Sequence, residues 1–417
     1  MLRKYKLGEL IEVTRGMSLP GENYSETGEL IRLTLGHFNY SGGGFKENTS
    51  KTDIFYIGEV KDEFILNKGD IITPLTEQAI GLLGTTAMIP EGGKYIQSQD
   101  VALVTPDENK LDRLFCYYLI SSDIVKKQLS IAAQQTKIRH TSPDKIKDCT
   151  IWIPDITIQK RIGEVLYNID QKIALNTRMN AELEAMAKQL YEYWFVQFDF
   201  PDENGKPYKS SGGKMVYNQT LKREIPEGWE VKNINHMVNF PKRSINPYEF
   251  PKKFFRHYSI PSYDECGSFK WEKGELIQSN KFMVREGQIL VSKLNPWYNR
   301  VVFVEKSFCS ICSTEFVILD TIKEDTKGYV YYTVKTNNFI SYCTKASTGT
   351  SHSQRRVSPD ILLDFKIAYE ENFISLYSSL VMPMIKRINK NIAEIRNLTH
   401  LRDSLLPLLM NGQITIE

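Results

Sequence analysis

The chain has 417 residues, and a typical domain size of about 150 residues predicts two or three domains. Hydrophobic residues make up 41% and charged residues 25%, which excludes a disordered or a fibrous chain. With 53 basic and 50 acidic residues the net charge is only +3, so a nucleic-acid surface has to come from local basic patches. No apolar run approaches the ~18 residues of a membrane-spanning helix, and no signal peptide is visible. We therefore expect a cytoplasmic protein without a membrane partner.

The first predicted domain, residues 1–154, is rich in short strands. Residues 11–14, 70–74 and 101–105 are β-branched or aromatic, and Gly, Pro or Asn turns lie around them. Near the end of this domain, residues 126–147 carry six Lys and Arg side chains against a single acid. Gln pairs well with adenine, Arg with guanine and Lys with phosphates, so this segment is a candidate DNA-binding loop. The candidate contacts are Gln134, Gln135, Lys137, Arg139 and His140.

A long amphipathic helix is predicted next, over residues 155–198. Apolar residues recur there at alternating steps of four and three, and Gly163 is the only Gly or Pro between residues 157 and 200. An isolated helix of this kind exposes its apolar stripe to water, so it needs a packing partner. The predicted seam consists of Ile162, Leu166, Ile169, Ile173, Asn176, Asn180, Leu183 and Leu190.

Residues 199–228 are rich in Gly, Pro and Ser and are predicted to form a linker. The second predicted domain, residues 229–371, again contains short β-branched strands. Two of its loops mix cations with polar or stackable side chains, which suits DNA, although the alternative for any one residue is a solvated surface loop. The candidate contacts are Lys293, Trp297, Arg300, Ser351, His352, Gln354, Arg355 and Arg356.

The last predicted domain, residues 372–417, is a second long helix. Pro383 should kink this helix or mark where its regular part begins. We expect it to pack antiparallel on the first long helix, with buried Asn side chains fixing the register at some cost in stability. The alternative is two unrelated helices, each packed on its own strand domain. The predicted seam is Ile388, Asn391, Ile395, Leu398 and Leu405.

The chain also repeats itself. Short matches recur in the same order at offsets of 214 to 218 residues: Gly69 with Gly287, 117–118 with 331–332, and 142–144 with 358–360. The sequence therefore predicts an α+β protein made of two copies of one module. Its two strand-rich domains would be joined by the two antiparallel helices, with pseudo-twofold internal symmetry.

Three segments resemble the specificity subunits of type I restriction–modification systems. They are residues 191–213 (YEYWFVQFDFPDENGKPYKSSGG), 225–231 (IPEGWEV) and 159–173 (QKRIGEVLYNIDQKI). The resemblance covers the whole chain in its order of target-recognition domain, helix, target-recognition domain and helix. It implies a DNA-recognition subunit without catalysis of its own, on which methyltransferase subunits and usually restriction subunits assemble.

The same resemblance implies that each recognition domain reads one half of a split target in double-stranded DNA. The paired helices would then act as a ruler for the unread spacer. No cofactor is expected on this chain, because S-adenosylmethionine, ATP and Mg²⁺ would belong to the partner subunits.

Two other classes of function compete with this interpretation. The first is a DNA methyltransferase or nuclease, because residues 295–298 (NPWY) approach an adenine methyltransferase motif and residues 359–366 imitate a nuclease motif. No Gly-rich cofactor loop accompanies them, and Cys309 and Cys312 have zinc-ligand spacing without a second pair. We therefore predict no catalytic residue and no metal site. The second is a coiled-coil scaffold that binds no DNA.

Overall fold

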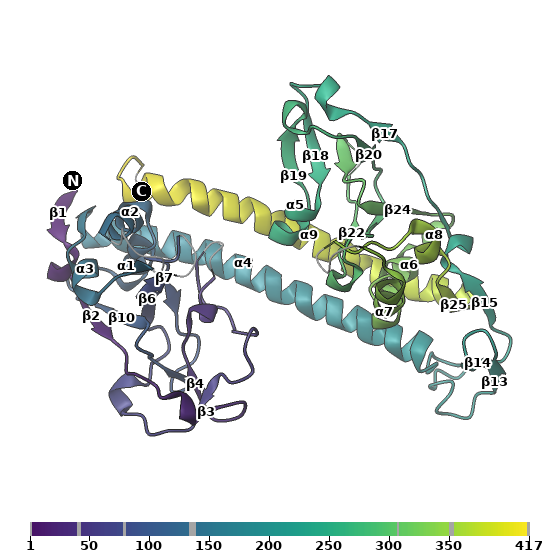
Figure 1. Cartoon of the computed structure of the whole chain (residues 1–417), viewed down its shortest axis with the longest axis horizontal. Coiled ribbons are helices and arrows are strands. Elements are labelled where there is room, and N and C mark those ends of the chain that lie inside the picture. Colours follow the sequence, from purple (N-terminus) through teal and green to yellow (C-terminus); the bar gives the residue numbers. More distant parts are fainter. Residues whose placement is uncertain are drawn as a thin grey trace. The chain divides into compact units, whose positions relative to one another are not determined.

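A computed structural model describes residues 2–39, 43–77, 81–132, 139–306, 308–349 and 354–414 (Figure 1). The chain divides into two compact units, Met1–Ile173 with Asn397–Glu417 and Ala174–Arg396. Each unit holds one strand-rich module and part of both long helices, α4 (Ile156–Tyr191) and α9 (Glu371–Met410). Among the described residues, no helix is both long enough and apolar enough to cross a membrane.

The module of the first unit is built on a four-stranded antiparallel sheet in the order β2-β10-β6-β8. A second sheet has the order β3-β5-β4-β9, and β1 pairs with β12. The strands are β1 (Arg3–Lys6), β2 (Ile11–Arg15), β3 (Tyr24–Ser25), β4 (Leu30–Arg32), β5 (Phe55–Tyr56), β6 (Ile71–Pro74), β7 (Thr76–Glu77), β8 (Ala87–Met88), β9 (Tyr95–Ile96), β10 (Val101–Pro106), β11 (Arg139–His140) and β12 (Thr150–Ile153). The helices are α1 (Arg113–Ile120), α2 (Asp123–Ala132) and α3 (Pro143–Lys147).

The module of the second unit repeats this plan with a four-stranded sheet in the order β16-β24-β21-β22 and the pair β15–β25. Its other sheet has five strands in the order β17-β20-β23-β18-β19. The strands are β15 (Glu230–Asn233), β16 (Val238–Asn239), β17 (Ser244–Ile245), β18 (Phe254–Tyr258), β19 (Lys270–Lys273), β20 (Lys281–Met283), β21 (Ile289–Ser292), β22 (Val301–Phe303), β23 (Ser310–Cys312), β24 (Phe316–Thr321) and β25 (Lys366–Tyr369). The helices are α5 (Ile260–Cys266), α6 (Lys327–Thr333), α7 (Asn337–Ala346) and α8 (Pro359–Leu363).

The predicted repeat and the α+β class are confirmed by this correspondence of sheets. It also explains the Ser-Pro-Asp match, because in both modules this tripeptide begins a short helix. The Ser142 hydroxyl accepts the Lys145 N–H at the start of α3, and the Ser358 hydroxyl accepts the Ile361 N–H at the start of α8. In each helix Pro occupies the first turn, where its missing N–H costs nothing.

The two long helices pack antiparallel, as predicted; two contacts in the second unit show the direction, and the helices also meet in the first unit. In the second unit, the Tyr377 hydroxyl donates to the Ala187 carbonyl at 2.8 Å, and the Asn391 side chain donates to Asn180 at 2.8 Å. In the first unit, Arg402 pairs with Asp170 at 2.8 Å. Partner numbers fall along α4 as they rise along α9, which excludes the alternative of two independent helices.

The seam positions of these helices differ in how deeply they are buried. Among the predicted seam positions Ile162, Leu166, Ile169, Asn176, Ile388 and Asn391 are buried, whereas Ile173, Asn180, Leu183, Leu190, Ile395, Leu398 and Leu405 are half-buried. Pro383 lies well inside α9, so it does not mark the beginning of that helix.

Each module is attached to the helices through the second Tyr of its Tyr-Tyr pair. The Tyr118 hydroxyl donates to Asp170 at 2.6 Å, and the Tyr332 hydroxyl donates to Glu184 at 3.4 Å. Glu184 also pairs with Lys335 at 2.6 Å. Both modules therefore use a carboxylate of α4 as their anchor point.

The segment predicted as a linker is an ordered part of the second unit. It contains the hairpin of β13 (Met215–Asn218) and β14 (Arg223–Pro226). Phe198 and Phe200 on its N-terminal side are buried in the core of that unit, and Asp199 accepts hydrogen bonds from Ser210. Polar composition suggested a flexible connection, but these aromatic side chains order the segment. The five predicted domain ranges themselves stay a prediction.

The first module contains a buried histidine that should make its stability depend on pH. His37 is almost fully buried, and its Nδ1 accepts the Thr34 N–H at 3.1 Å. Burial lowers the pKa of His37 from 6.5 to about 4. The folded ring therefore stays neutral in a range where the unfolded ring takes up a proton.

We expect the stabilisation from neutral His37 to be complete above pH 6.5 and to be lost as the pH falls toward 4. The shift of about 2.5 pKa units corresponds to about 3 kcal/mol of unfolding free energy. Urea unfolding between pH 7.5 and 4 measures it, and His37→Gln should flatten the curve. His400, which is exposed on α9, supplies the control His400→Gln. An equal pH slope in wild type and His37→Gln would contradict the assignment.

Candidate nucleic-acid interface

The loop between β21 and β22 makes an outward turn in the second module. It consists of a short 3-10 helix, Pro296–Tyr298, flanked by Asn295 and Asn299. Both Asn residues have left-handed backbones, with φ of 49° and 48°, a conformation that Asn tolerates better than most residues. The turn leaves the rings of Trp297 and Tyr298 exposed to solvent. It lies between two strands, β21 and β22.

The structure joins this loop to the second candidate loop through the backbone. The Asn295 N–H donates to the Arg355 carbonyl at 2.7 Å, and the Arg355 N–H donates to the Asn295 side chain at 3.0 Å. Leu294 and Arg356 form an antiparallel bridge beside them. Two surfaces that the sequence placed 60 residues apart, from Asn295 to Arg355, thus form one.

The cations of this joined surface differ in how firmly they are held. Arg355 is half-buried and donates from Nη2 to the Ser347 carbonyl at 2.5 Å. Arg356 is exposed and pairs with Glu315 at 3.0 Å, a hydrogen bond that raises the pKa of the guanidinium. Gln354 is exposed, and Lys293 is half-buried. The predicted contacts Ser351 and His352 lie outside the described residues.

Arg300 has a different position from the one predicted for a DNA contact. Its guanidinium is buried and makes two hydrogen bonds with Asp264 of α5, at 2.6 and 2.8 Å. The same group lies 4.5 Å from the centre of the Tyr298 ring. This arrangement argues against direct DNA contact by Arg300, because the side chain fixes the loop to α5 from beneath. Asp264 was missed, since no sequence motif links it to Arg300.

The first module joins its two loops in the same way. Strand β7 pairs with β11, so that Thr76 lies opposite His140. In the internal repeat, Thr76 corresponds to Leu294 at an offset of 218, and His140 corresponds to Arg356 at an offset of 216. Leu294 and Arg356 form the antiparallel bridge of the second module. His140 is exposed. The predicted contacts Gln134, Gln135 and Lys137, and the side chain of Arg139, lie outside what the structure describes.

The loop after β7 is held by a buried carboxylate. Glu77 accepts hydrogen bonds from the N–H groups of Gly81 and Leu82, the latter at 3.0 Å. Asn295 occupies the matching position in the second module and also accepts a backbone N–H through its side chain. Glu77 thus holds residues of its own loop, whereas Asn295 holds the backbone of the neighbouring loop at Arg355.

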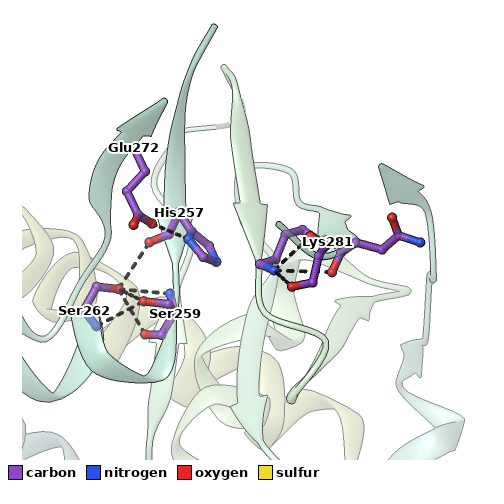
Figure 2. Close-up of polar contacts among 7 residues, drawn as sticks. His257, Ser259, Ser262, Glu272 and Lys281 are labelled. Carbon is purple, nitrogen blue, oxygen red and sulfur yellow. Dashed lines mark hydrogen bonds and ion pairs between the residues drawn. The ribbon is translucent and has the colours of Figure 1, made fainter. Parts of the chain in front are cut away.

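His257, Glu272 and Ser262 of the second module are the residue types of a catalytic triad. Figure 2 shows that they are not arranged as one. His257 contacts the Glu272 carboxylate through Nδ1, as a catalytic base would. The nearby Ser262 hydroxyl, however, donates to the His257 carbonyl at 3.2 Å and has no contact with the imidazole ring. Burial lowers the pKa of His257. Within the described residues no nucleophile is paired with this ring, and the contacts of the cluster link β18, β19 and α5.

Cys312 lies in strand β23, whereas Cys309 lies in the turn just before it, with a left-handed φ of 52°. Cys312 is buried in β23, and burial raises the pKa of its thiol. Within the described ranges, no group of three or more His, Cys, Asp or Glu side chains is placed to hold a metal ion.

Comparisons with known proteins agree with this architecture. Residues 2–185 match the family described as "Type I restriction modification DNA specificity domain". The chain is 24% identical over 316 residues to the type I restriction enzyme MjaIX specificity subunit of Methanocaldococcus jannaschii, covering 73% of this chain and 69% of that protein. It is 21% identical over 377 residues to the HindI specificity subunit of Haemophilus influenzae, covering 77% and 81%. The fold matches the crystal structure of the type I S subunit from M. genitalium with a TM-score of 0.61, 15% identity and coverage of 98% and 96%.

The match to the type I restriction modification DNA specificity domain thus covers the first module and most of α4. The second module repeats the topology of the first, and the chain as a whole is similar to the specificity subunits of type I restriction enzymes.

Proposed function

We propose that this chain is the non-catalytic DNA-recognition subunit of a type I restriction–modification complex. The observation that supports it most strongly is the joined pair of loops found at equivalent points of both modules. Two equivalent surfaces on two copies of one module suit a split target, with one half-site read by each module. The surface of the second module presents Gln354 and Arg356, side chains that hydrogen-bond base edges and phosphates.

The partners follow from the same function. The chain binds double-stranded DNA and assembles with methyltransferase subunits and with restriction subunits in the cytoplasm. S-adenosylmethionine, ATP and Mg²⁺ act on those subunits, and this chain contributes the choice of target and the positioning of the active sites.

Arg356→Ala tests the proposal in the complex assembled with methyltransferase subunits. If Arg356 reads a base, its loss should weaken specific binding by about 1–3 kcal/mol and relax preference in one half of the target only. Selection from a randomised duplex library measures both effects. Arg285→Ala is the control, because Arg285 is also an exposed arginine paired with an acid in the same module but lies outside the loops. Unchanged selection by Arg356→Ala would move the recognition surface elsewhere.

A further inference from the structure

The hairpin of β18 and β19 carries a second exposed surface that the joined loops do not include. In its register Phe254 lies opposite Lys273, and Arg256 lies opposite Trp271. Side chains alternate between the two faces of a strand, so these four residues share one face. Phe254 is 50% exposed and Trp271 is 47% exposed, so this face presents two large rings to solvent.

The orientation of this face is fixed by what lies behind it. Phe255, on the opposite face, is buried with Ile277 and Ile311. His257 is buried on that same face and meets Glu272 of β19, the contact drawn in Figure 2. The hairpin therefore cannot turn its rings inward without exposing this core, and Phe254 and Trp271 stay in solvent.

Each exposed ring is paired with a cation across the hairpin. The Lys273 ammonium lies 5.8 Å from the centre of the Phe254 ring, and the Arg256 guanidinium lies 5.0 Å from the centre of the Trp271 ring. No ion pair involves Arg256 within the described part of the chain, and Lys273 has only a loose, exposed pair with Glu275 at 3.5 Å. Lys273 is about half exposed and can meet an anion directly, whereas the half-buried Arg256, which also lies 5.3 Å from the Phe269 ring, can do so only beyond its covered Nε.

The matching strand of the first module lacks this character. Strands β4 and β18 each run parallel to a neighbour in their sheets, β9 and β23. On β4, however, Arg32 is buried, pairs with Asp53 at 3.2 Å and covers the Tyr24 ring at 3.7 Å. The first module thus neutralises its Arg and covers its ring, whereas the second leaves both available.

We propose that the outer face of the β18–β19 hairpin binds unpaired DNA, with bases stacking on Phe254 and Trp271 and phosphates meeting Lys273 and Arg256. Two rings on diagonal positions of a hairpin lie about 7–8 Å apart, which leaves room for one base on each. A duplex covers the faces of its bases by stacking, so only unpaired nucleotides offer the surface that these rings need.

This inference rests on the proposed function, because a partner methyltransferase that modifies a base must first extrude it and leave nucleotides unpaired. An acidic protein segment would satisfy the two cations, but it would not use the two rings. The rings therefore favour nucleic acid as the occupant.

The test uses the complex of the full chain with methyltransferase subunits and a fluorescent 12-nucleotide thymidine strand. Trp271→Ala and Phe254→Ala should each weaken binding to this strand about tenfold, while Trp271→Phe should stay close to wild type. Tyr217→Ala is the matched control, because Tyr217 is 56% exposed on the β13–β14 hairpin but lies opposite Glu224. Its affinity for the strand should be unchanged. Thermal unfolding of each variant checks that the module remains folded.

Three results would overturn the inference: unchanged strand binding in both alanine variants, an equal loss on a fully paired duplex, or displacement of the strand by polyglutamate as effectively as by unlabelled thymidine strand. Duplex selection by Arg356→Ala is read separately. If the hairpin variants bind the strand normally but Arg356→Ala alters duplex preference, the inference fails and the proposed function stands. If the hairpin variants lose strand binding but Arg356→Ala leaves duplex preference unchanged, only the proposed function is refuted.

Discussion

Asp264→Ala should destabilise the second module by about 3 kcal/mol. The substitution removes the partner of Arg300, whose side chain is only 9% exposed and whose Nη1 has no hydrogen bond within the described structure. A buried cation that loses its carboxylate typically costs 3–5 kcal/mol, and the half-exposed position of Asp264 places the loss at the lower end. Because Arg300 also supports the Tyr298 ring, we expect weaker recognition of one half-site.

Chemical denaturation measures the change in stability, and the duplex selection described above measures the change in recognition. Glu265→Ala is the control on the same helix, because Glu265 pairs with Lys270 at the surface, where both side chains are about half exposed. Such a pair contributes at most about 1 kcal/mol. If Asp264→Ala and Glu265→Ala lowered the free energy of unfolding by similar amounts, the buried Arg300–Asp264 pair would contribute no more to stability than an exposed pair.

Inserting seven residues into both long helices should lengthen the spacer that the complex prefers by about three base pairs. The chain passes between units after Ile173 in α4 and after Arg396 in α9, so matched insertions there preserve the seam within each unit. Seven residues add about 10 Å of helix, which equals about three base-pair steps of 3.4 Å. Seven extra residues rotate the rest of each helix by only ~20° beyond whole turns, whereas three extra base pairs rotate the second half-site by about 100°. Because the recognition domain and its half-site would then be rotated relative to each other, we also expect weaker DNA binding.

The measurement is a selection from duplexes with fixed half-sites and variable spacers. Insertion into α4 alone is the control, because it displaces Asp170 from Arg402 or Asn180 from Asn391 and should lower stability instead of defining a new spacer. An active double-insertion complex that keeps the original spacer would contradict the ruler, as would a change in the bases read within each half.

Elements with a regular pattern were predictable from the sequence. The seam of α4 repeats over 36 residues, so its period identified the helix and its need for a partner. The offset of the two copies predicted the shared topology. The contact between Thr76 and His140 has no local pattern, because strands of two residues show no periodicity.

The repeat did contain the signal for joined loops, since the bridging residues of one module map onto those of the other. What the sequence could not reveal was which cations are buried. In the sequence, Arg300 and Arg356 both lie in loops that mix cations with polar or stackable side chains. Only the folded chain places Asp264 against Arg300 and Glu315 against Arg356. Likewise, the polar segment after Phe200 resembled a linker because composition does not show that its aromatic side chains enter a core.

The way in which the loops are joined has a consequence for how specificity can evolve. Thr76 meets His140, and Leu294 meets Arg356, through main-chain pairing, so among the described contacts that join the loops only that of Asn295 with Arg355 uses a side chain. The attachment of the modules to α4 depends instead on Tyr118 and Tyr332, which lie outside the loops. Substitutions that change the bases read can therefore accumulate in the loops while the frame, and with it the assembly of the complex, is inherited unchanged.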